Sequence, residues 1–202
     1  QTGEIGVAVQ SKFVAVGSVV PYAKAGIGAV ASQAWGNPRY GPIGLELLAS
    51  GKSALEAVDL MTSADPHRNS RQLAIIATEG NASVFTGSEC LEWAGGKYGV
   101  IYAVQGNILT GPEVIVAMGK AFEDNNGTLA ERMIASLHAG QKAGGDKRGR
   151  QSAALLIVRS GWGYGGLTDR FRDLRVDDHP TPIKELERIY YIHRKIFPRP
   201  VQ

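Results

Sequence analysis

The spacing of apolar residues predicts strands at the start of the chain, followed by short helices. Residues 4–20 and 25–34 are rich in Val and Ala with few polar interruptions, which is typical of buried strands. Residues 43–47 and 55–61 then place apolar side chains at helical spacing, and Ser53 is a predicted N-cap between them. The first third of the chain is therefore predicted to form two or three strands and two short helices.

The rest of the chain repeats this alternation of strands and helix pairs. Two apolar runs on either side of the turn-rich residues 78–81 predict a hairpin. The later elements are a strand at residues 100–104, helices around 114–122 and 129–137, strands at 153–158 and 171–176, and a helix from 182 to about 197 that Thr181 and Pro182 begin. This order favours an α+β fold, with antiparallel sheets covered by helices, over one parallel sheet.

Composition limits the classes of protein to consider. With 202 residues and 44% hydrophobic content, we expect one domain over residues 1–197, with 198–202 as the start of a C-terminal tail or linker. The net charge of +3, from 22 basic and 19 acidic residues, is small, the basic residues are scattered, and aromatic residues are few, so nucleic acid is not an expected partner. No apolar run approaches the roughly 20 residues of a membrane helix, so no membrane association is expected.

Cysteine and histidine use gives little sign of metal or redox chemistry. Cys90 is the single cysteine, which excludes a disulfide within the chain and any cysteine-based metal cluster, and fits a cytoplasmic location. Asp177, Asp178 and His179 are adjacent, but neighbouring strand residues point to opposite sides and Pro180 predicts a turn. We therefore expect neither a metal site nor a cofactor.

The densest group of polar residues lies between Gly144 and Ser152, which read GGDKRGRQS. The glycine pair permits backbone conformations closed to other residues, and the apolar strand at 153–158 follows at once. A carboxylate, three cations and an amide thus lie at the mouth of a buried strand. This placement suggests a binding loop.

Several motifs in one order resemble a bacterial and archaeal family of unassigned function that is grouped with the Ntn hydrolases. The motifs are GEIGVAVQSKF at residues 3–13, GAVASQA at 28–34, NPxYG at 37–41, VQGNIL at 104–109, the loop 144–152, and LRVDDHP at 174–180. The resemblance covers nearly the whole chain. It implies a four-layer αββα sandwich of Ntn-hydrolase type, with two antiparallel sheets between helix layers.

The resemblance also implies a nucleophile at the mature N-terminus. In Ntn hydrolases a Thr, Ser or Cys attacks, and its own α-amine, with a pKa of about 8, takes the proton. Gln1 cannot do this, and Thr2 precedes Gly3 in a turn, so we expect a nucleophilic Thr on a first strand of about 5 to 6 residues upstream of residue 1. The alternative is a binding or assembly protein that keeps the scaffold without catalysis.

Candidate site residues follow from the ends of the expected strands. Ser11 and Lys12 end the strand beside the expected nucleophile, where Lys12 would keep an amine neutral or stabilise negative charge; the alternative is an ordinary edge lysine. Gln33 and Asn37 follow the next long strand and would bind a substrate amide or carboxylate, or else simply form a turn.

A second group of candidates comes from later turns. Gly106 and Asn107 would form an oxyanion hole from a backbone N–H and a side-chain amide, or else an ordinary turn. Asp146 would orient an amine and Arg148 would bind a carboxylate, unless the two pair with each other in a solvated loop. Gln151 is a further binding candidate at the start of the strand.

With these residues in the named roles, the resemblance implies an amide hydrolase of Ntn type. Its substrate would be a small amide or a peptide-like compound, and by analogy with Ntn relatives we expect a homo-oligomer.

Overall fold

In the part of the chain that the structure describes, the protein has a mixed α+β fold built from antiparallel strands and five α-helices. The computed structural model describes residues 2–200. One sheet has the order β1-β8-β9, formed by Ile5–Ser11, Ser152–Val158 and Arg170–Val176. A second has the order β2-β3-β4-β5, formed by Pro21–Lys24, Gly28–Ala34, Arg71–Ala77 and Ala82–Thr86. A hairpin joins β6, Gly95–Tyr98, to β7, Ala103–Gly106.

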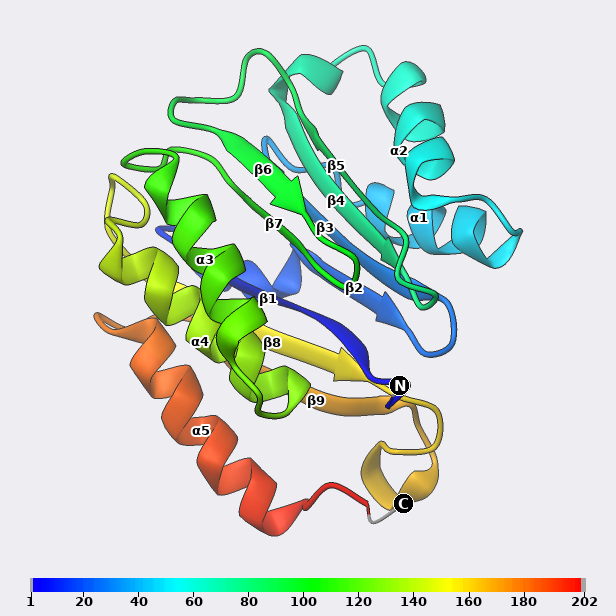
Figure 1. Ribbon diagram of the computed structural model, residues 1–202, viewed down its shortest axis with the longest axis vertical. Helices are drawn as coiled ribbons and strands as arrows, with labels where there is room; N and C mark the ends of the chain where they lie inside the picture. The colour runs from blue at the N-terminus through cyan, green and yellow to red at the C-terminus, as the bar shows by residue number, and fades with distance from the viewer. Residues whose placement is uncertain (1, 201–202) are drawn as a thin grey trace.

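The helices lie on the outside of these sheets (Figure 1). Helices α1, Tyr40–Ala49, and α2, Ala54–Ser63, pack on the second sheet, whereas α4, Leu129–Lys142, and α5, Pro182–Ile196, pack on the first. Helix α3, Glu113–Asp124, packs against α4 and against the β6–β7 hairpin. Three short 3-10 turns complete the fold, at Val16–Ser18, Arg68–Ser70 and Tyr164–Gly166.

Strand β8 is the central strand of the first sheet, and an apolar layer covers each of its faces. All seven of its residues are buried. Alternate side chains point to opposite faces, so Leu155 packs with Leu186 of α5, whereas Leu156 packs with Ile5 of β1 and Ala29 of β3. The two sheets therefore contact each other through one face of β8 and β1, and the helices cover the other face.

Most of the predicted elements are confirmed, with one clear error in the middle of the chain. Ser53 caps α2 in a capping box with Glu56, as the sequence indicated. The strand predicted at 100–104 lies instead at 103–106, because Gly99–Tyr102 closes a hairpin with β6. Strand β6 was missed because its residues, Gly-Gly-Lys-Tyr, carry no apolar pattern. None of the helices among the described residues is long and apolar enough to cross a membrane.

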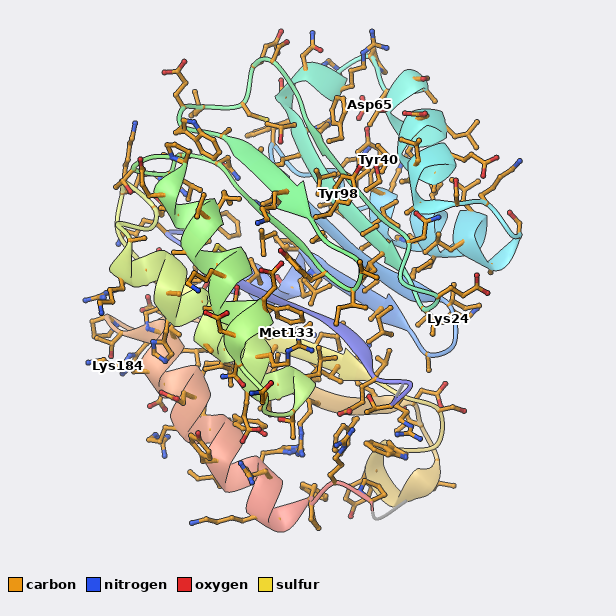
Figure 2. The ribbon with its side chains drawn as sticks, viewed as in Figure 1. Lys24, Tyr40, Asp65, Tyr98, Met133 and Lys184 are labelled. Atoms are coloured by element: carbon orange, nitrogen blue, oxygen red, sulfur yellow. The ribbon has the colours of Figure 1, made fainter. Side chains whose placement is uncertain are left out.

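A buried ion pair anchors the second sheet to α1. Asp65 accepts hydrogen bonds from Arg71 Nε at 3.0 Å, the Tyr40 hydroxyl at 2.8 Å and the His67 backbone N–H at 2.8 Å. Figure 2 shows Tyr40 and Asp65 together beside α1 and α2. Burial by itself would raise the pKa of Asp65, but these three donors outweigh it and lower the pKa to about 2.

Folding should therefore depend on Asp65 in acid. Because its pKa is lower in the folded than in the unfolded state, its contribution of about 2 kcal/mol is present above about pH 4 and is lost as the pH falls toward 2. The free energy of unfolding should fall between pH 5 and pH 2 in the wild type and in the Asp65→Asn variant. We predict that the fall is about 2 kcal/mol smaller in Asp65→Asn, as measured by urea denaturation at both pH values. Asp59→Asn, at an exposed position on α2, is the control. Equal acid dependence in the wild type and Asp65→Asn would contradict this assignment.

The packing of β8 against α5 gives a second prediction. Leu155 is fully buried, so Leu155→Ala should lower the free energy of unfolding by about 2–5 kcal/mol through lost burial and a new cavity. Leu60→Ala, at a half-exposed position on α2, should change it by no more than about 0.5 kcal/mol. Urea denaturation of both variants at neutral pH makes the comparison, and similar losses would show that β8 is not the centre of this core.

Candidate active site

A largely apolar cavity lies between β1 and β7. Strands β3 and β4 close it on one side and helices α3 and α4 on the other. It encloses about 930 Å³ of space that no atom fills, its open side included. We call it the β1–β7 cavity.

The cavity runs along the edges of two strands. Five consecutive residues of β1, Ile5 to Val9, line it, as do the consecutive residues 101–105 at β7. Neighbouring strand residues point to opposite faces, so an unbroken run of lining residues places the cavity beside the backbone itself. Within residues 2–200, β1 pairs only with β8 and β7 only with β6. Each strand thus presents an unpaired backbone edge to the cavity.

The loop 144–148 joins the two strands at one end of the cavity. The Lys12 backbone N–H, just after β1, lies 3.5 Å from Asp146 Oδ2, and Asp146 also forms an isolated bridge with Leu109, just after β7. The Lys147 N–H donates to the Ile108 carbonyl at 2.8 Å. The C-terminal ends of β1 and β7 therefore meet at the loop that the sequence marked as polar.

A buried carboxamide joins this end to the second sheet. Gln72, at the start of β4, is fully buried, and its Nε2 donates to the Gly106 carbonyl at 2.8 Å and to the Gly95 carbonyl at 3.2 Å. Its Oε1 accepts from Gln33 Nε2 at 2.8 Å and from Asn107 Nδ2 at 3.3 Å. Three of the predicted residues, Gln33, Gly106 and Asn107, thus meet at one side chain.

Two unusual backbone conformations lie next to the same carboxamides. Ala34, directly after Gln33, has φ 64°, and Ile108, directly after Asn107, has φ 56°. For a β-branched residue this conformation is strained, by about 1–3 kcal/mol. Bonds on both sides hold Ile108 in place, since its N–H donates to the Leu91 carbonyl and its carbonyl accepts from Lys147. Such strain is concentrated at functional sites more often than elsewhere.

The remaining residues at this end have more ordinary surroundings. Ser11 ends β1 opposite Ser152, and Lys12 is exposed. Gly106 lies under Leu109, since a Cβ added there would come within 2.5 Å of the Leu109 side chain. Close packing is therefore a sufficient reason for the glycine, whatever its N–H does in a reaction.

Arg148 and Asp146 pair with each other. Asp146 accepts from the Arg148 backbone N–H at 2.8 Å and from its guanidinium at 3.0 and 2.7 Å. The Asp146 side chain is largely buried, whereas Arg148 is exposed. The pairing considered from the sequence is therefore present, and it holds the carboxylate beside Lys12.

Asn37 and Gln151 contact other parts of the protein. Asn37 forms the turn after β3: its backbone bonds with the Ser32 hydroxyl, and its Nδ2 lies 3.4 Å from Asp65. The Gln151 side chain donates to Asp178 at 3.1 Å, on the far side of β8 from the β1–β7 cavity. The structure thus gives both side chains partners outside the cavity.

The described residues offer neither a reactive cysteine nor a cluster of metal ligands. Burial raises the pKa of the Cys90 thiol, which donates to the Arg71 carbonyl at 3.3 Å, so this cysteine is a poor nucleophile. The described residues contain no group of three or more His, Cys, Asp or Glu side chains that could hold a metal ion.

The sequence interpretation missed two glutamines, Gln72 and Gln105. Gln105, on β7, donates its Nε2 to the Ala31 carbonyl at 3.1 Å and lines the cavity. The available signal was a carboxamide inside an apolar strand, as in the run Gln72-Leu73-Ala74-Ile75. Burying such a group is costly unless several partners bond to it.

The strands and loops that form this site lie within a region that matches a known protein family. The model of a family of unknown function, DUF1028, matches residues 1–186. Protein SPO2555 from Silicibacter pomeroyi, whose crystal structure carries the same family label, is 34% identical, with a TM-score of 0.88 over 96% of this chain and 81% of that chain. No curated protein matches the chain. The matched residues include every strand that lines the cavity.

Replacing Gln72 tests whether it organises this end. Gln72→Met keeps the length of the side chain but leaves the buried Gly106 and Gly95 carbonyls without their donor, so unfolding free energy should fall by about 2–4 kcal/mol. Gln151→Met, at a partly exposed position, should change it by less than about 1 kcal/mol. Thermal and urea denaturation measure both, and a Gln72→Met variant as stable as Gln151→Met would contradict the proposed role.

Proposed function

Because the chain belongs to the DUF1028 family, whose function is unknown, we propose its function from the site itself: an amide hydrolase of the N-terminal nucleophile type. The observation that carries this proposal is the β1–β7 cavity. Two strand edges that are unpaired within residues 2–200 face each other there, and their C-terminal ends meet a group of polar side chains. A further strand could bond to both edges, and its first residue would then lie among the polar side chains and could act as the nucleophile.

The proposal places a strand from the segment before residue 1 in the cavity. A strand joined to β1 by a short turn runs antiparallel to it and bonds to its free edge. The same strand would bond to β7, so that β6, β7, the added strand, β1, β8 and β9 would form one sheet. With the β2–β5 sheet and the helices outside, the complete fold would be the four-layer αββα sandwich of Ntn hydrolases.

The direction of this strand determines where its N-terminus lies. An antiparallel neighbour of β1 begins where β1 ends, at Ser11 and Lys12. The proposed nucleophile, a Thr with a free α-amine, would therefore lie at the polar end of the cavity, beside Lys12, Asp146 and Asn107. The antiparallel geometry of neighbouring strands supports this placement.

The polar side chains at this end have roles in the proposed reaction. The Thr hydroxyl adds to the carbonyl carbon of the amide, and the α-amine takes its proton and passes it to the leaving amine. Lys12 keeps the α-amine neutral by its charge and stabilises the negative oxygen, with the second Asn107 amide hydrogen as a further donor. The Gly106 N–H, which the sequence also offered, faces Gly95 of β6 in the β6–β7 pairing and takes no part. Water then hydrolyses the ester that remains on the Thr.

Substrate selection is assigned to the side chains around the same end. Gln33 lines the cavity and Ser11 ends β1, while the Asp146–Arg148 pair forms the rim. We propose a small amide or peptide-like substrate in the cytoplasm. A homo-oligomer is part of the proposal because helix α2 leaves Leu55 and Leu60 exposed.

The test begins with the N-terminus of the native protein. N-terminal sequencing and intact mass should identify a mature chain that begins with Thr, and its replacement by Ala should abolish amide hydrolysis in a substrate screen. Lys12→Met should lower kcat by roughly 100-fold with little change in stability. Lys24→Met, at an exposed position at the other end of the sheets, should leave kcat unchanged.

Two results would reject this function. A mature chain that begins with a residue other than Thr, Ser or Cys has no nucleophile of this type and would favour a binding or assembly protein on the same scaffold. Undiminished hydrolysis after the Thr replacement would likewise exclude the mechanism.

A further inference from the structure

We infer that the polar end of the β1–β7 cavity binds the nitrogen of a neutral primary amide, through carboxamide oxygens whose orientation the protein fixes. This inference deepens the proposed function by naming the group of the substrate that is recognised. Its structural basis, however, is the hydrogen bonding of Gln72, Gln33, Asn107 and Gln105, which involves no nucleophile.

The orientation of Gln72 comes first. Its amide nitrogen lies 2.8 Å from the Gly106 carbonyl oxygen and 3.2 Å from the Gly95 carbonyl oxygen. Carbonyl oxygens only accept hydrogen bonds, so the NH₂ group must face them and the carboxamide cannot be flipped. The oxygen of Gln72 consequently points toward Gln33 and Asn107.

Gln72 in turn orients its two neighbours. An amide oxygen only accepts, so Gln33 and Asn107 must both direct their NH₂ groups toward Gln72 Oε1. Their own oxygens then point away from Gln72. No described residue donates a hydrogen bond to Gln33 Oε1 or Asn107 Oδ1, and Gln33 lines the cavity.

Gln105 adds a third oxygen on the same side. Its Nε2 faces the Ala31 carbonyl, which again only accepts, so its orientation is fixed as well. Its Oε1 is buried and has no hydrogen-bond partner among the described residues. Ala31 and Gln33 are two residues apart on β3 and therefore share a face, and both line the cavity with Gln105. Buried acceptors normally have a donor, and we assign this one to a ligand. If the strand proposed upstream of residue 1 donates instead, none of the probes below will shift the Gln105 signal.

Nearby charges select among the possible donors. A carboxylate would place its oxygens against carboxamide oxygens, which is repulsive. An ammonium group would lose its hydration without gaining a free counter-charge, because Asp146, the carboxylate at this end, is already bound bidentately by Arg148. A neutral –NH₂ group meets neither penalty and can donate two hydrogen bonds.

Three probes with the same carbon chain distinguish these donors: propionamide, propylammonium chloride and sodium propionate. Each is titrated into the native full-length protein while side-chain amide signals are followed by ¹H–¹⁵N NMR. Propionamide should shift the NH₂ signals of Gln33, Asn107 and Gln105, and should bind roughly fivefold to tenfold more tightly than the other two. Propionate binding as tight as propionamide, or no shift at these side chains, would overturn the inference.

A change of charge provides the sharper test. Gln33→Glu replaces a neutral acceptor by a carboxylate of the same shape, so it should reverse the preference and make propylammonium the tightest of the three probes. It also removes the donor to Gln72 Oε1, and the melting temperature measures the stability lost with that bond. Gln151→Glu adds the same charge outside the cavity and should leave the order unchanged. A Gln33→Glu variant that keeps its melting temperature and still prefers propionamide would overturn the inference.

These experiments measure equilibrium binding and need no turnover. A failed nucleophile test with intact propionamide binding would reject the hydrolase and retain the amide site. Amide hydrolysis without the predicted shifts would retain the hydrolase and reject the amide site.

Discussion

The position of the β6–β7 hairpin on the second sheet, at the polar end of the cavity, depends on one buried side chain, the carboxamide of Gln72. It bonds to Gln33 on β3, Thr86 on β5, Gly95 on β6 and Gly106 on β7. A buried amide is costly unless its donors and acceptor are all used, and here each is used by a different strand. These polar contacts hold the hairpin β6–β7 against the second sheet at this end, while its buried residues Tyr102 and Val104 pack in one apolar cluster with α3.

Backbone pairing explains why the polar side chains are concentrated at one end of the cavity. Strands β1 and β7 both terminate beside the loop 144–148, whose Asp146 bonds to the chain just beyond each strand. The loop can approach because Gly144 and Gly145 adopt positive φ angles directly after α4. The polar loop 144–148 therefore has a structural role, because it joins the C-terminal ends of β1 and β7 by hydrogen bonds. A ligand that binds at this end would contact a loop that these bonds already hold in place.

The sequence predicted the elements well where period and length were clear, as in β8 and the helices. It failed where tertiary contacts determine the outcome. Strand β6 has no apolar period, and Asn37, placed beside Gln33 by proximity in the chain, turns toward Asp65 instead. Gln72 directly precedes the apolar run 73–77, and its importance lies in partners from segments far along the chain. The carboxamide next to an apolar run is visible in the sequence, but its long-range hydrogen-bond partners are not.

The fixed direction of the carboxamides also changes what the site can recognise. A glutamine can normally present either its oxygen or its NH₂ group, so Gln33 alone suited a substrate amide or a carboxylate equally well. Once Gln72 uses the NH₂ group of Gln33, the oxygen is the end left with no partner among the described residues, and a carboxylate becomes the wrong ligand. Specificity here arises from the orientation that a buried neighbour imposes on a flexible, neutral side chain, and the identity of the lining residue alone does not determine it.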